Sequence, residues 1–327
     1  MTPWNLLALP PLPVDLIRRL LAPLGDRVSV RAPATRDRAA LLAALPEAEI
    51  VLGDWTGELT LDAAAVAAAP RLAFLQQPSV GVDGHDLAAL AAAGVPVANT
   101  AGVSAGAVAE WCVAAALAVT RKLAAADAAV RAGEWPQQAL QPRELGAARV
   151  GVVGYGPIGE ACARLFGAFG GRVSYWTRTP REDPRYTALE DLLETSDVVV
   201  VVIALSEETR GLIDPRRLKR GAVLVNAARG GVVDQDGLVA ALRSGHLGGA
   251  ALDVFDAEPL PPGDPLRELP GVLLSPHVAG VTQEATGRLM TVTLDNLAAA
   301  VEGREVVNVV NGVCQPITRK YSESPAS

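Results

Sequence analysis

Three polar residues in the second half of the chain, Arg229, Glu258 and His277, have side chains suited to acid–base chemistry on an anionic molecule. A guanidinium holds anionic groups through a fork of N–H donors, and an imidazole supported by a carboxylate can take up or release a proton near neutral pH. Each residue also has an ordinary alternative: a surface charge, a loop acid or a core histidine. Two glycines follow Arg229 and prolines adjoin the other two, which is typical of tight turns. Together they predict a site that binds an anion and transfers a proton.

A glycine-rich stretch upstream, Gly154-Tyr155-Gly156-Pro157-Ile158-Gly159, is typical of a turn that binds a dinucleotide. An apolar run precedes it and helical spacing follows, so it stands between a strand and a helix. In that context the first glycine permits the turn, the second lets the backbone approach a pyrophosphate, and the third lets helix and strand pack closely. The alternative is a strand–turn–helix corner that binds nothing. With the cation, carboxylate and imidazole downstream, the turn predicts an oxidoreductase that reduces a carbonyl group.

The end of the next strand, near Trp176, indicates which dinucleotide is preferred. Chains that bind NAD usually carry an acidic residue there, which accepts from the ribose 2′-hydroxyl. This chain has Thr177 and Arg178, with Arg181 close behind. No carboxylate repels a 2′-phosphate and a guanidinium can pair with one, so we expect NADP(H) to be preferred, with NAD(H) possible. The alternative is that Arg178 stacks on adenine or faces solvent.

Short β-rich runs alternate with helix-length segments almost throughout, which is typical of parallel sheets covered by helices. The runs of the central portion are nearly continuous in aliphatic residues, as in strands buried on both faces. They predict strands over 149–153, 172–176, 198–203, 222–226, 249–252 and 272–274. Two long helices are predicted, over 104–131 and 283–302. We therefore expect an α/β protein with two Rossmann-like, doubly wound parallel-sheet domains and an interdomain cleft: residues 1–98 plus 286–327 form a discontinuous substrate-binding domain, and 99–285 form the dinucleotide-binding domain.

Composition narrows the class of protein. The 29 basic and 36 acidic residues give a formal net charge of −7, which argues against a nucleic-acid or membrane partner. The densest basic run, 216–220, is typical of a solvated helix end. The three cysteines form no pair with disulfide or metal spacing, so we predict no metal site and a reducing, cytoplasmic compartment. The first residues read as a strand, not as a signal peptide.

With these segments in order, the chain resembles the D-isomer-specific 2-hydroxyacid dehydrogenases over nearly its whole length. The branch of NADP-dependent glyoxylate and hydroxypyruvate reductases is the most similar, chiefly because of Thr177-Arg178. The resemblance implies a small 2-keto or 2-hydroxy acid as substrate. It also implies a homodimer, formed through the cofactor domain and the long helix after Ser104.

The resemblance also implies roles for individual residues. His277 would be the proton donor in reduction, Glu258 would orient its ring and favour the protonated form, and Arg229 would hold the substrate carboxylate and carbonyl oxygen. Val80 and Gly81, in a loop whose family counterpart clasps the carboxylate through its amides, would bind substrate. Asp253 matches a family acid near the nicotinamide and would position the cofactor or support the site.

Two positions depart from the family pattern or leave alternatives open. Ile203-Ala-Leu-Ser206 stands where the family commonly has Leu-Pro, and Trp55 stands where the family lines its substrate pocket. An indole in the pocket favours a small keto acid, whereas a buried structural tryptophan is the alternative. A formate- or phosphite-type dehydrogenase, and a corepressor-like protein that senses dinucleotide without catalysis, remain the competing functions.

Overall fold

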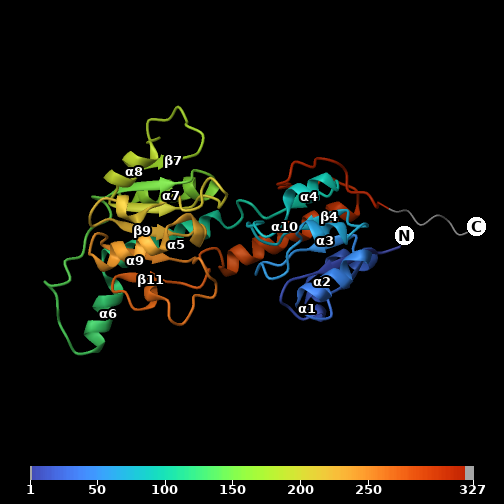
Figure 1. Cartoon of the computed structure of the whole chain (residues 1–327), viewed down its shortest axis with the longest axis horizontal. Coiled ribbons are helices and arrows are strands. Elements are labelled where there is room, and N and C mark those ends of the chain that lie inside the picture. Colours follow the sequence, from blue (N-terminus) through green and yellow to red (C-terminus); the bar gives the residue numbers. More distant parts are fainter. Residues whose placement is uncertain (1, 321–327) are drawn as a thin grey trace, which may run out of the picture. The chain divides into compact units, whose positions relative to one another are not determined.

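The computed structural model describes residues 2–320, and the chain divides into two compact units. Unit 1 comprises residues 1–103 and 286–327, and unit 2 comprises residues 104–285 (Figure 1). Each unit contains one parallel sheet, of five strands in unit 1 and six in unit 2. The predicted α/β class is therefore confirmed.

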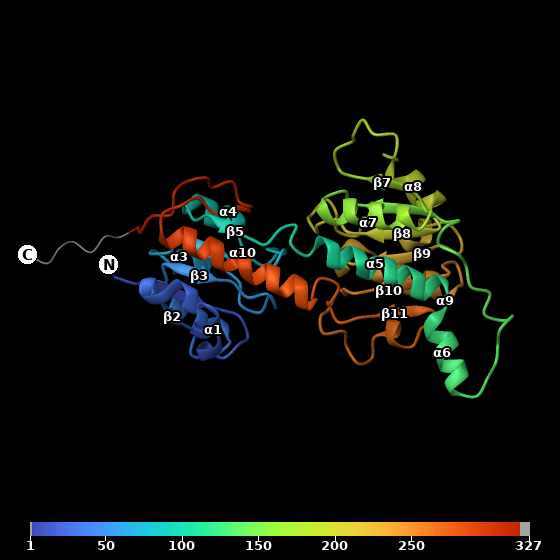
Figure 2. The same cartoon turned by 180° about the vertical axis from the view of Figure 1, so that it is seen from behind.

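In unit 1 the strands lie in the order β2-β1-β3-β4-β5, all parallel. Their bounds are β1 (Trp4–Ala8), β2 (Val28–Arg31), β3 (Ile50–Leu52), β4 (Phe74–Gln76) and β5 (Val97–Ala98). One face packs against α1 (Val14–Leu20) and α10 (Gln283–Val301), and the other against α2 (Arg38–Ala44), α3 (Ala63–Ala67) and α4 (Leu87–Ala92) (Figures 1 and 2). The last three helices each begin after an aspartate whose carboxylate accepts from a backbone amide of the first turn: Asp37, Asp62 and Asp86.

In unit 2 the strands lie in the order β7-β6-β8-β9-β10-β11, again all parallel. They are β6 (Arg149–Val153), β7 (Arg172–Trp176), β8 (Val198–Val201), β9 (Val223–Asn226), β10 (Gly249–Leu252) and β11 (Val272–Leu274). One face of the sheet packs against α5 (Ala105–Thr120) and α7 (Pro157–Ala168), and the other against α8 (Leu189–Thr195) and α9 (Gln235–Arg243) (Figures 1 and 2). Short 3-10 turns complete the two units: η1 (Ala22–Arg27), η2 (Leu45–Glu47), η3 (Pro215–Arg217), η4 (Gly230–Val232) and η5 (Pro265–Arg267).

Both sheets share one topology, in which the first strand lies between the second and the third. The chain thus winds first to one side of β1 or β6 and then to the other, which makes both sheets doubly wound. Ligands of such sheets bind beyond the carboxyl ends of the strands, at the point where the winding reverses. In unit 2 this point is the end of β6, where the glycine-rich turn begins.

The predicted helix over 104–131 is wrong in one respect, because it is broken into α5 and α6 (Leu123–Arg131). Lys122, between them, has a left-handed backbone with φ of 54°. The alanine-rich sequence continues across the break, so the pattern of residues predicts one uninterrupted helix. The environment changes there, since α5 is largely buried whereas none of the residues of α6 is.

Candidate active site

The glycine-rich turn of unit 2 has the geometry that a bound dinucleotide requires. Gly154 has a φ of 100°, and a Cβ atom there would lie 2.9 Å from the backbone of Ile203. A Cβ at Gly159 would lie 2.0 Å from the carbonyl oxygen of Gly154, so helix α7 and strand β6 meet too closely for any side chain. By contrast, a Cβ at Gly156 would meet nothing within 4 Å. The turn is therefore closed on its packing side and open at Gly156, just before the start of α7, where a pyrophosphate would fit.

The residues after β7 divide into two groups. The guanidinium of Arg178 is exposed, and its Nη1 atom lies 3.2 Å from Oε2 of Glu208. Thr177 turns its hydroxyl to the carbonyl oxygen of Thr179, at 2.6 Å. Arg181 instead lies over the ring of Tyr155, with Nη2 donating to the Tyr155 carbonyl oxygen at 3.4 Å. Arg178 thus pairs with Glu208 in solvent near the strand end, whereas Arg181 supports the glycine-rich turn.

Tyr155 itself, the second residue of the turn, is nearly buried and stacks on Tyr175 of β7, with ring centroids 3.7 Å apart. A second guanidinium, from Arg185, lies over both rings. This aromatic pair fixes the turn to the neighbouring strand.

Arg229 and Glu258 stand on two turns that pack directly against each other. A Cβ at Gly230 would lie 2.0 Å from the carbonyl carbon of Phe255, so only glycine allows this approach. The side-chain amide of Asn226, the last residue of β9, donates to the Arg229 carbonyl oxygen at 3.1 Å and fixes the arginine turn. The positive charge of Arg229 also contributes to lowering the pKa of Glu258, which indicates that the two side chains are near each other.

Glu258 and His277 form a hydrogen-bonded pair, with 2.7 Å between Oε2 and Nδ1. The other carboxylate oxygen, Oε1, accepts from the Phe255 amide at 3.0 Å. Burial alone would raise the pKa of Glu258, but the hydrogen bonds from His277 and Phe255 and the charges of His277 and Arg229 outweigh burial and lower it. The carboxylate therefore stays ionised beside the ring. His277 is 48% exposed, and in the described part of the chain its Nε2 atom makes no hydrogen bond.

Asp253 holds the segment that carries His277. Its buried carboxylate accepts from the Ser275 hydroxyl at 2.6 Å and from the amides of Val278 at 2.9 Å and Ala279 at 2.7 Å, and its carbonyl oxygen accepts from the His277 amide. His277 itself has a φ of 55°, a conformation that non-glycine residues seldom adopt without such support. The direct contacts of Asp253 are thus with the histidine loop.

In unit 1 the loop containing Val80 and Gly81 presents two backbone amides. The Thr100 amide donates to the Ser79 carbonyl oxygen at 3.2 Å, and the Asn99 side-chain amide donates to the Val80 carbonyl oxygen at 2.7 Å. Because N–H and C=O point in opposite directions across a trans peptide, these bonds turn the N–H groups of Val80 and Gly81 away from the end of β5. Among residues 2–320 neither amide donates to a protein acceptor. Such a pair of outward N–H groups can bind a carboxylate.

The structure excludes one of the two interpretations of Trp55. Its side chain is 46% exposed, so it is not a buried structural tryptophan. Asp54, just before it, is buried and anchors this loop through an ion pair with Arg36, 2.7 Å between Oδ2 and Nη2. Trp55 is therefore an exposed indole on a fixed loop that follows β3.

Sequence reasoning missed Gln77 and Asn99, two buried polar residues near the strand ends of unit 1. A polar residue directly after an apolar strand was the available signal. His85 is also buried, and its ring bonds both the Leu61 amide and Gln77.

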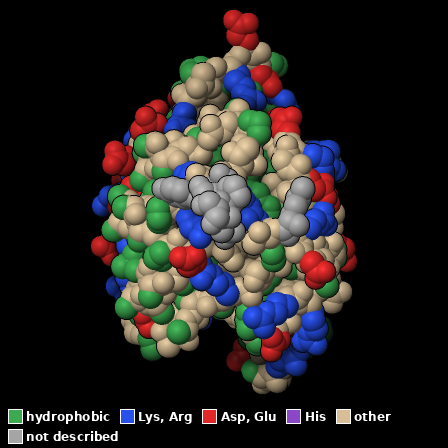
Figure 3. Space-filling model, turned by 90° about the vertical axis from the view of Figure 1, so that its right-hand side faces the viewer, with side chains coloured by type: hydrophobic (Ala, Val, Ile, Leu, Met, Phe, Trp, Pro, Cys, Tyr) green, Lys and Arg blue, Asp and Glu red, His purple; other side chains and the backbone are tan. Residues whose placement is uncertain are grey.

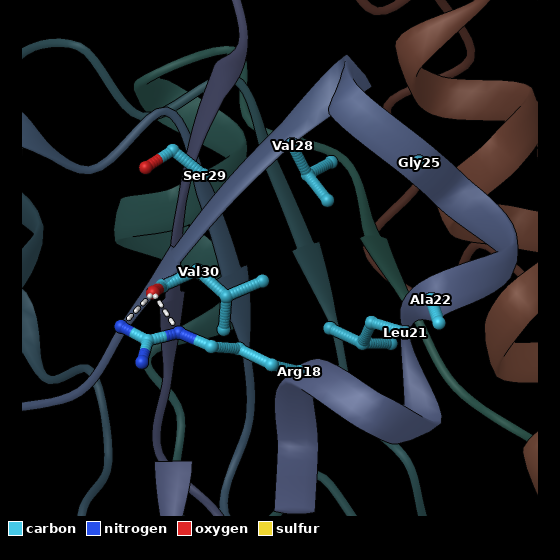
Figure 4. A pocket seen from close by; sticks show the side chains of 7 residues that line it. All are labelled: Arg18, Leu21, Ala22, Gly25, Val28, Ser29 and Val30. Carbon is cyan, nitrogen blue, oxygen red and sulfur yellow. Dashed lines mark hydrogen bonds between the residues drawn. The ribbon is translucent and has the colours of Figure 1, made fainter. Parts of the chain in front are cut away.

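Among residues 2–320, the pocket beside β2 and the basic run 216–220 offer no competing site. A pocket of about 340 Å³ beside β2 has one charged lining residue, Arg18, which already donates to the Val30 carbonyl oxygen (Figure 4) and to Asp15. The face of the molecule in Figure 3 shows basic and acidic side chains interspersed. In the basic run, Arg216 pairs with Asp214 and Asp234. None of the helices over residues 2–320 is long and apolar enough to cross a membrane.

The chain is similar to known proteins over most of its length. Residues 113–279 match the family model of the D-isomer-specific 2-hydroxyacid dehydrogenase NAD-binding domain. A glyoxylate reductase of Thermofilum pendens is 40% identical over 77% of this chain and 78% of its own length. A D-3-phosphoglycerate dehydrogenase of Mycobacterium leprae is 38% identical over 92% of this chain, which spans only 59% of that relative. The structure of an NADPH-dependent glyoxylate/hydroxypyruvate reductase from Sinorhizobium meliloti, in complex with NADP and malonate, has a TM-score of 0.82 and 29% identity over 98% of this chain and all of that one.

Proposed function

The chain belongs to the NAD(P)-dependent D-isomer-specific 2-hydroxyacid dehydrogenases, and we propose that it interconverts small 2-keto and D-2-hydroxy acids, with glyoxylate and hydroxypyruvate as the keto substrates. The observation that carries this proposal is the contact between Glu258 and His277 beside Arg229, on loops that follow the strands of a dinucleotide-binding sheet. It leaves one imidazole nitrogen for a substrate oxygen.

A nicotinamide cofactor held at the turn from Gly154 to Gly159 would supply the hydride for reduction of the carbonyl carbon. His277 donates the proton that the carbonyl oxygen needs, through the Nε2 atom that faces away from Glu258. Glu258, which is held ionised, keeps Nδ1 engaged and stabilises the ring when it carries a proton. Arg229 binds the carboxylate and carbonyl oxygen of the acid and stabilises the negative charge that develops there. In oxidation the same ring accepts the proton of the hydroxyl group.

The binding of substrate and cofactor uses further residues. The outward amides of Val80 and Gly81 bind the substrate carboxylate, and Trp55 limits the size of the substrate, which favours small keto acids. The turn from Gly154 to Gly159 receives the pyrophosphate. Asp253 acts by holding the histidine loop at the nicotinamide end.

We propose NADP(H) as the preferred dinucleotide. The exposed guanidinium of Arg178 stands just after β7, where the ribose 2′ position would lie, and the residue that follows the strand is Thr177 instead of an acid. Glu208, which pairs with Arg178, weakens this preference, because its charge would repel a 2′-phosphate.

A homodimer is the proposed assembly. Helix α6 and the segment after it carry large apolar side chains in solvent, with Leu123 54%, Val130 55% and Trp135 79% exposed. Leu123 and Val130 are seven residues apart and therefore share a helix face. An exposed apolar surface of this kind is typical of a protein interface, and a second copy of the chain would cover it.

The experiment that tests the function is a turnover assay followed at the nicotinamide absorbance band. Glyoxylate, hydroxypyruvate and bulkier keto acids are offered with NADPH or NADH, while D-3-phosphoglycerate and formate are offered with the oxidised cofactors. We expect the highest kcat/KM with NADPH and one of the two small keto acids. Turnover of D-3-phosphoglycerate alone would favour the activity named for the mycobacterial relative, and turnover of formate alone would favour a formate-type enzyme.

A further inference from the structure

A buried side chain in unit 1 joins two loops that follow neighbouring strands. Gln77 lies directly after β4 and is only 3% exposed. Its Nε2 atom donates to the carbonyl oxygen of Asp54 at 3.1 Å and to the hydroxyl of Ser79 at 2.8 Å. Asp54 precedes Trp55, and Ser79 begins the loop of Val80 and Gly81. One amide group therefore connects the two loops to which we assign substrate binding.

The orientation of this amide is set by His85. The Nδ1 atom of His85 accepts from the Leu61 amide at 3.1 Å, so the ring proton is on Nε2, which donates to Oε1 of Gln77 at 3.2 Å. An amide accepts at one end and donates at the other. The bond from His85 to Oε1 therefore directs the Nε2 group of Gln77 toward Asp54 and Ser79.

The surrounding structure leaves space for this side chain. A Cβ atom at Gly53 would lie 2.0 Å from Oε1 of Gln77, so residue 53 must be glycine for Gln77 to occupy its position. The carboxylate of Asp54 accepts from the amides of Thr56 and Leu59 and pairs with Arg36. The loop that Gln77 contacts is thus itself held in one conformation.

The contact with Ser79 reaches the proposed carboxylate-binding amides. The Ser79 hydroxyl accepts from Gln77 and donates to the Gly81 carbonyl oxygen at 3.3 Å. This hydrogen bond and the one from Asn99 to Val80 act on successive peptide groups of the same short loop. A shift of Gln77 would therefore release the carbonyl group of Gly81, the residue whose N–H is assigned to the substrate, and loosen the backbone that follows it.

We propose that Gln77, oriented by His85, is a positioning residue that fixes the Trp55 loop and the Val80–Gly81 loop relative to each other and thereby sets the KM for the keto acid. The inference rests on the proposed function, because that function assigns substrate binding to the two loops. The cofactor turn belongs to unit 2, so cofactor affinity should not depend on Gln77.

The test uses Gln77→Met, which keeps the length of the side chain and removes its hydrogen bonds. We expect KM for glyoxylate or hydroxypyruvate to rise about tenfold, as for the loss of one charge-assisted hydrogen bond, with kcat and the Kd for NADPH changed little. Ile17→Val is the matched control, since it removes one methyl group from the core of unit 1 at α1. It should lower the melting temperature without changing KM.

A second variant, Gln77→Glu, separates positioning from a purely structural role. A protonated carboxyl can accept from His85 and donate to Ser79, as the amide does, whereas an ionised one cannot donate. The charged or titratable groups around it are His85, Asp54, Arg36 and Glu58. We expect the ratio of its KM to that of the wild type to fall as the pH is lowered from about 8 to about 5.5.

The outcomes distinguish this inference from the proposed function. If the wild type reduces keto acids but Gln77→Met keeps the wild-type KM, the inference is overturned and the function stands. If the wild type reduces none of them, the proposed function is refuted. The positioning role is then tested by the amide hydrogen-exchange rates of the two loops. Faster exchange over 54–61 and 78–86 in Gln77→Met, with unit 2 unchanged, would support the positioning role; unchanged exchange there would end it.

Discussion

His277 is the residue on which the proposed chemistry depends most. We expect His277→Ala to lower kcat/KM by about 10²- to 10⁴-fold, because no other group would donate the proton to the carbonyl oxygen. Binding of NADPH, measured by fluorescence, should be retained. His246→Ala is the matched control, since His246 also lies in unit 2 and its ring bonds only the Leu218 carbonyl oxygen in the described chain. A His277→Ala variant with near-normal turnover would contradict the assignment.

Arg178 and Glu208 provide a test of cofactor preference at the end of β7. Arg178→Ala should lower kcat/KM with NADPH by about 10- to 100-fold and leave NADH nearly unaffected, since only NADPH carries the 2′-phosphate. Glu208→Gln should raise the preference for NADPH, because it removes a negative charge beside the guanidinium. Equal losses with both cofactors in Arg178→Ala would show instead that this side chain stacks on adenine.

His85 makes the stability of the protein depend on pH. Burial lowers the pKa of His85 from 6.5 to about 4, although the charge of Asp54 acts in the opposite direction. The unfolded chain binds this proton from about pH 6.5 downward and the folded chain only near pH 4, so stability is complete above pH 6.5 and decreases between the two values. The loss is roughly 3 kcal/mol on going to pH 4. Urea unfolding at pH 7 and pH 4 measures it, and His85→Gln should lose less stability than the wild type over this interval.

The sequence predicts those candidate site residues whose side-chain type alone suits them to a particular chemical role. Arg229, Glu258 and His277 could be proposed from the sequence, because a cation, a carboxylate and an imidazole after a glycine-rich turn suit one kind of chemistry. The structure brings Glu258 and His277 into contact. Gln77 and His85 could not be proposed in this way, because their partners are set by tertiary packing. The same holds for Arg181, which contacts the glycine-rich turn 26 residues earlier.

Helix α7 and the turn before it offer a test in which three glycines have different roles. Gly159→Ala should destabilise the protein and abolish cofactor binding, because its Cβ would lie 2.0 Å from the Gly154 carbonyl oxygen. Gly156→Ala should weaken cofactor binding with little loss of stability, since a Cβ there meets no protein atom within 4 Å. Gly167→Ala, in the same helix and also without neighbours, should stabilise the fold by about 0.4–1 kcal/mol.

Thermal unfolding and NADPH titration of the three variants separate these roles. If Gly156→Ala bound cofactor as tightly as the wild type, the open side of the turn would not be the pyrophosphate site. If Gly159→Ala were as stable as Gly167→Ala, the close contact between helix and strand would not be required.

The helices and strands could be predicted where a regular pattern of apolar residues in the sequence marks the positions that become buried. The strands of unit 2 are nearly continuous in aliphatic residues because helices cover both faces, and β6, β7, β10 and β11 have the predicted bounds. Strand β8 ends two residues earlier than predicted, at Val201, since the apolar run continues into the loop that packs against Gly154. The break at Lys122 left no sign in the pattern, because it depends on the backbone of a single residue.

The proposed dimer accounts for the exposed apolar residues of α6 and the segment after it. The chain mass is 33.8 kDa, and we expect light scattering to measure twice that mass for the wild type. Replacing Leu123, Val130 and Trp135 together by glutamine should shift the protein toward a monomer, because the exposed side chains would no longer gain from burial.

The matched control for that experiment is Phe169→Gln, which removes an apolar side chain of similar exposure at the end of α7. It should leave the mass unchanged, so a shift confined to the triple variant would assign the interface to α6. Because the three residues lie outside the proposed reacting groups, NADPH titration should still detect cofactor binding in the monomer. A triple variant that remains a dimer would place the interface elsewhere on the chain, and a wild type of 33.8 kDa would refute the dimer altogether.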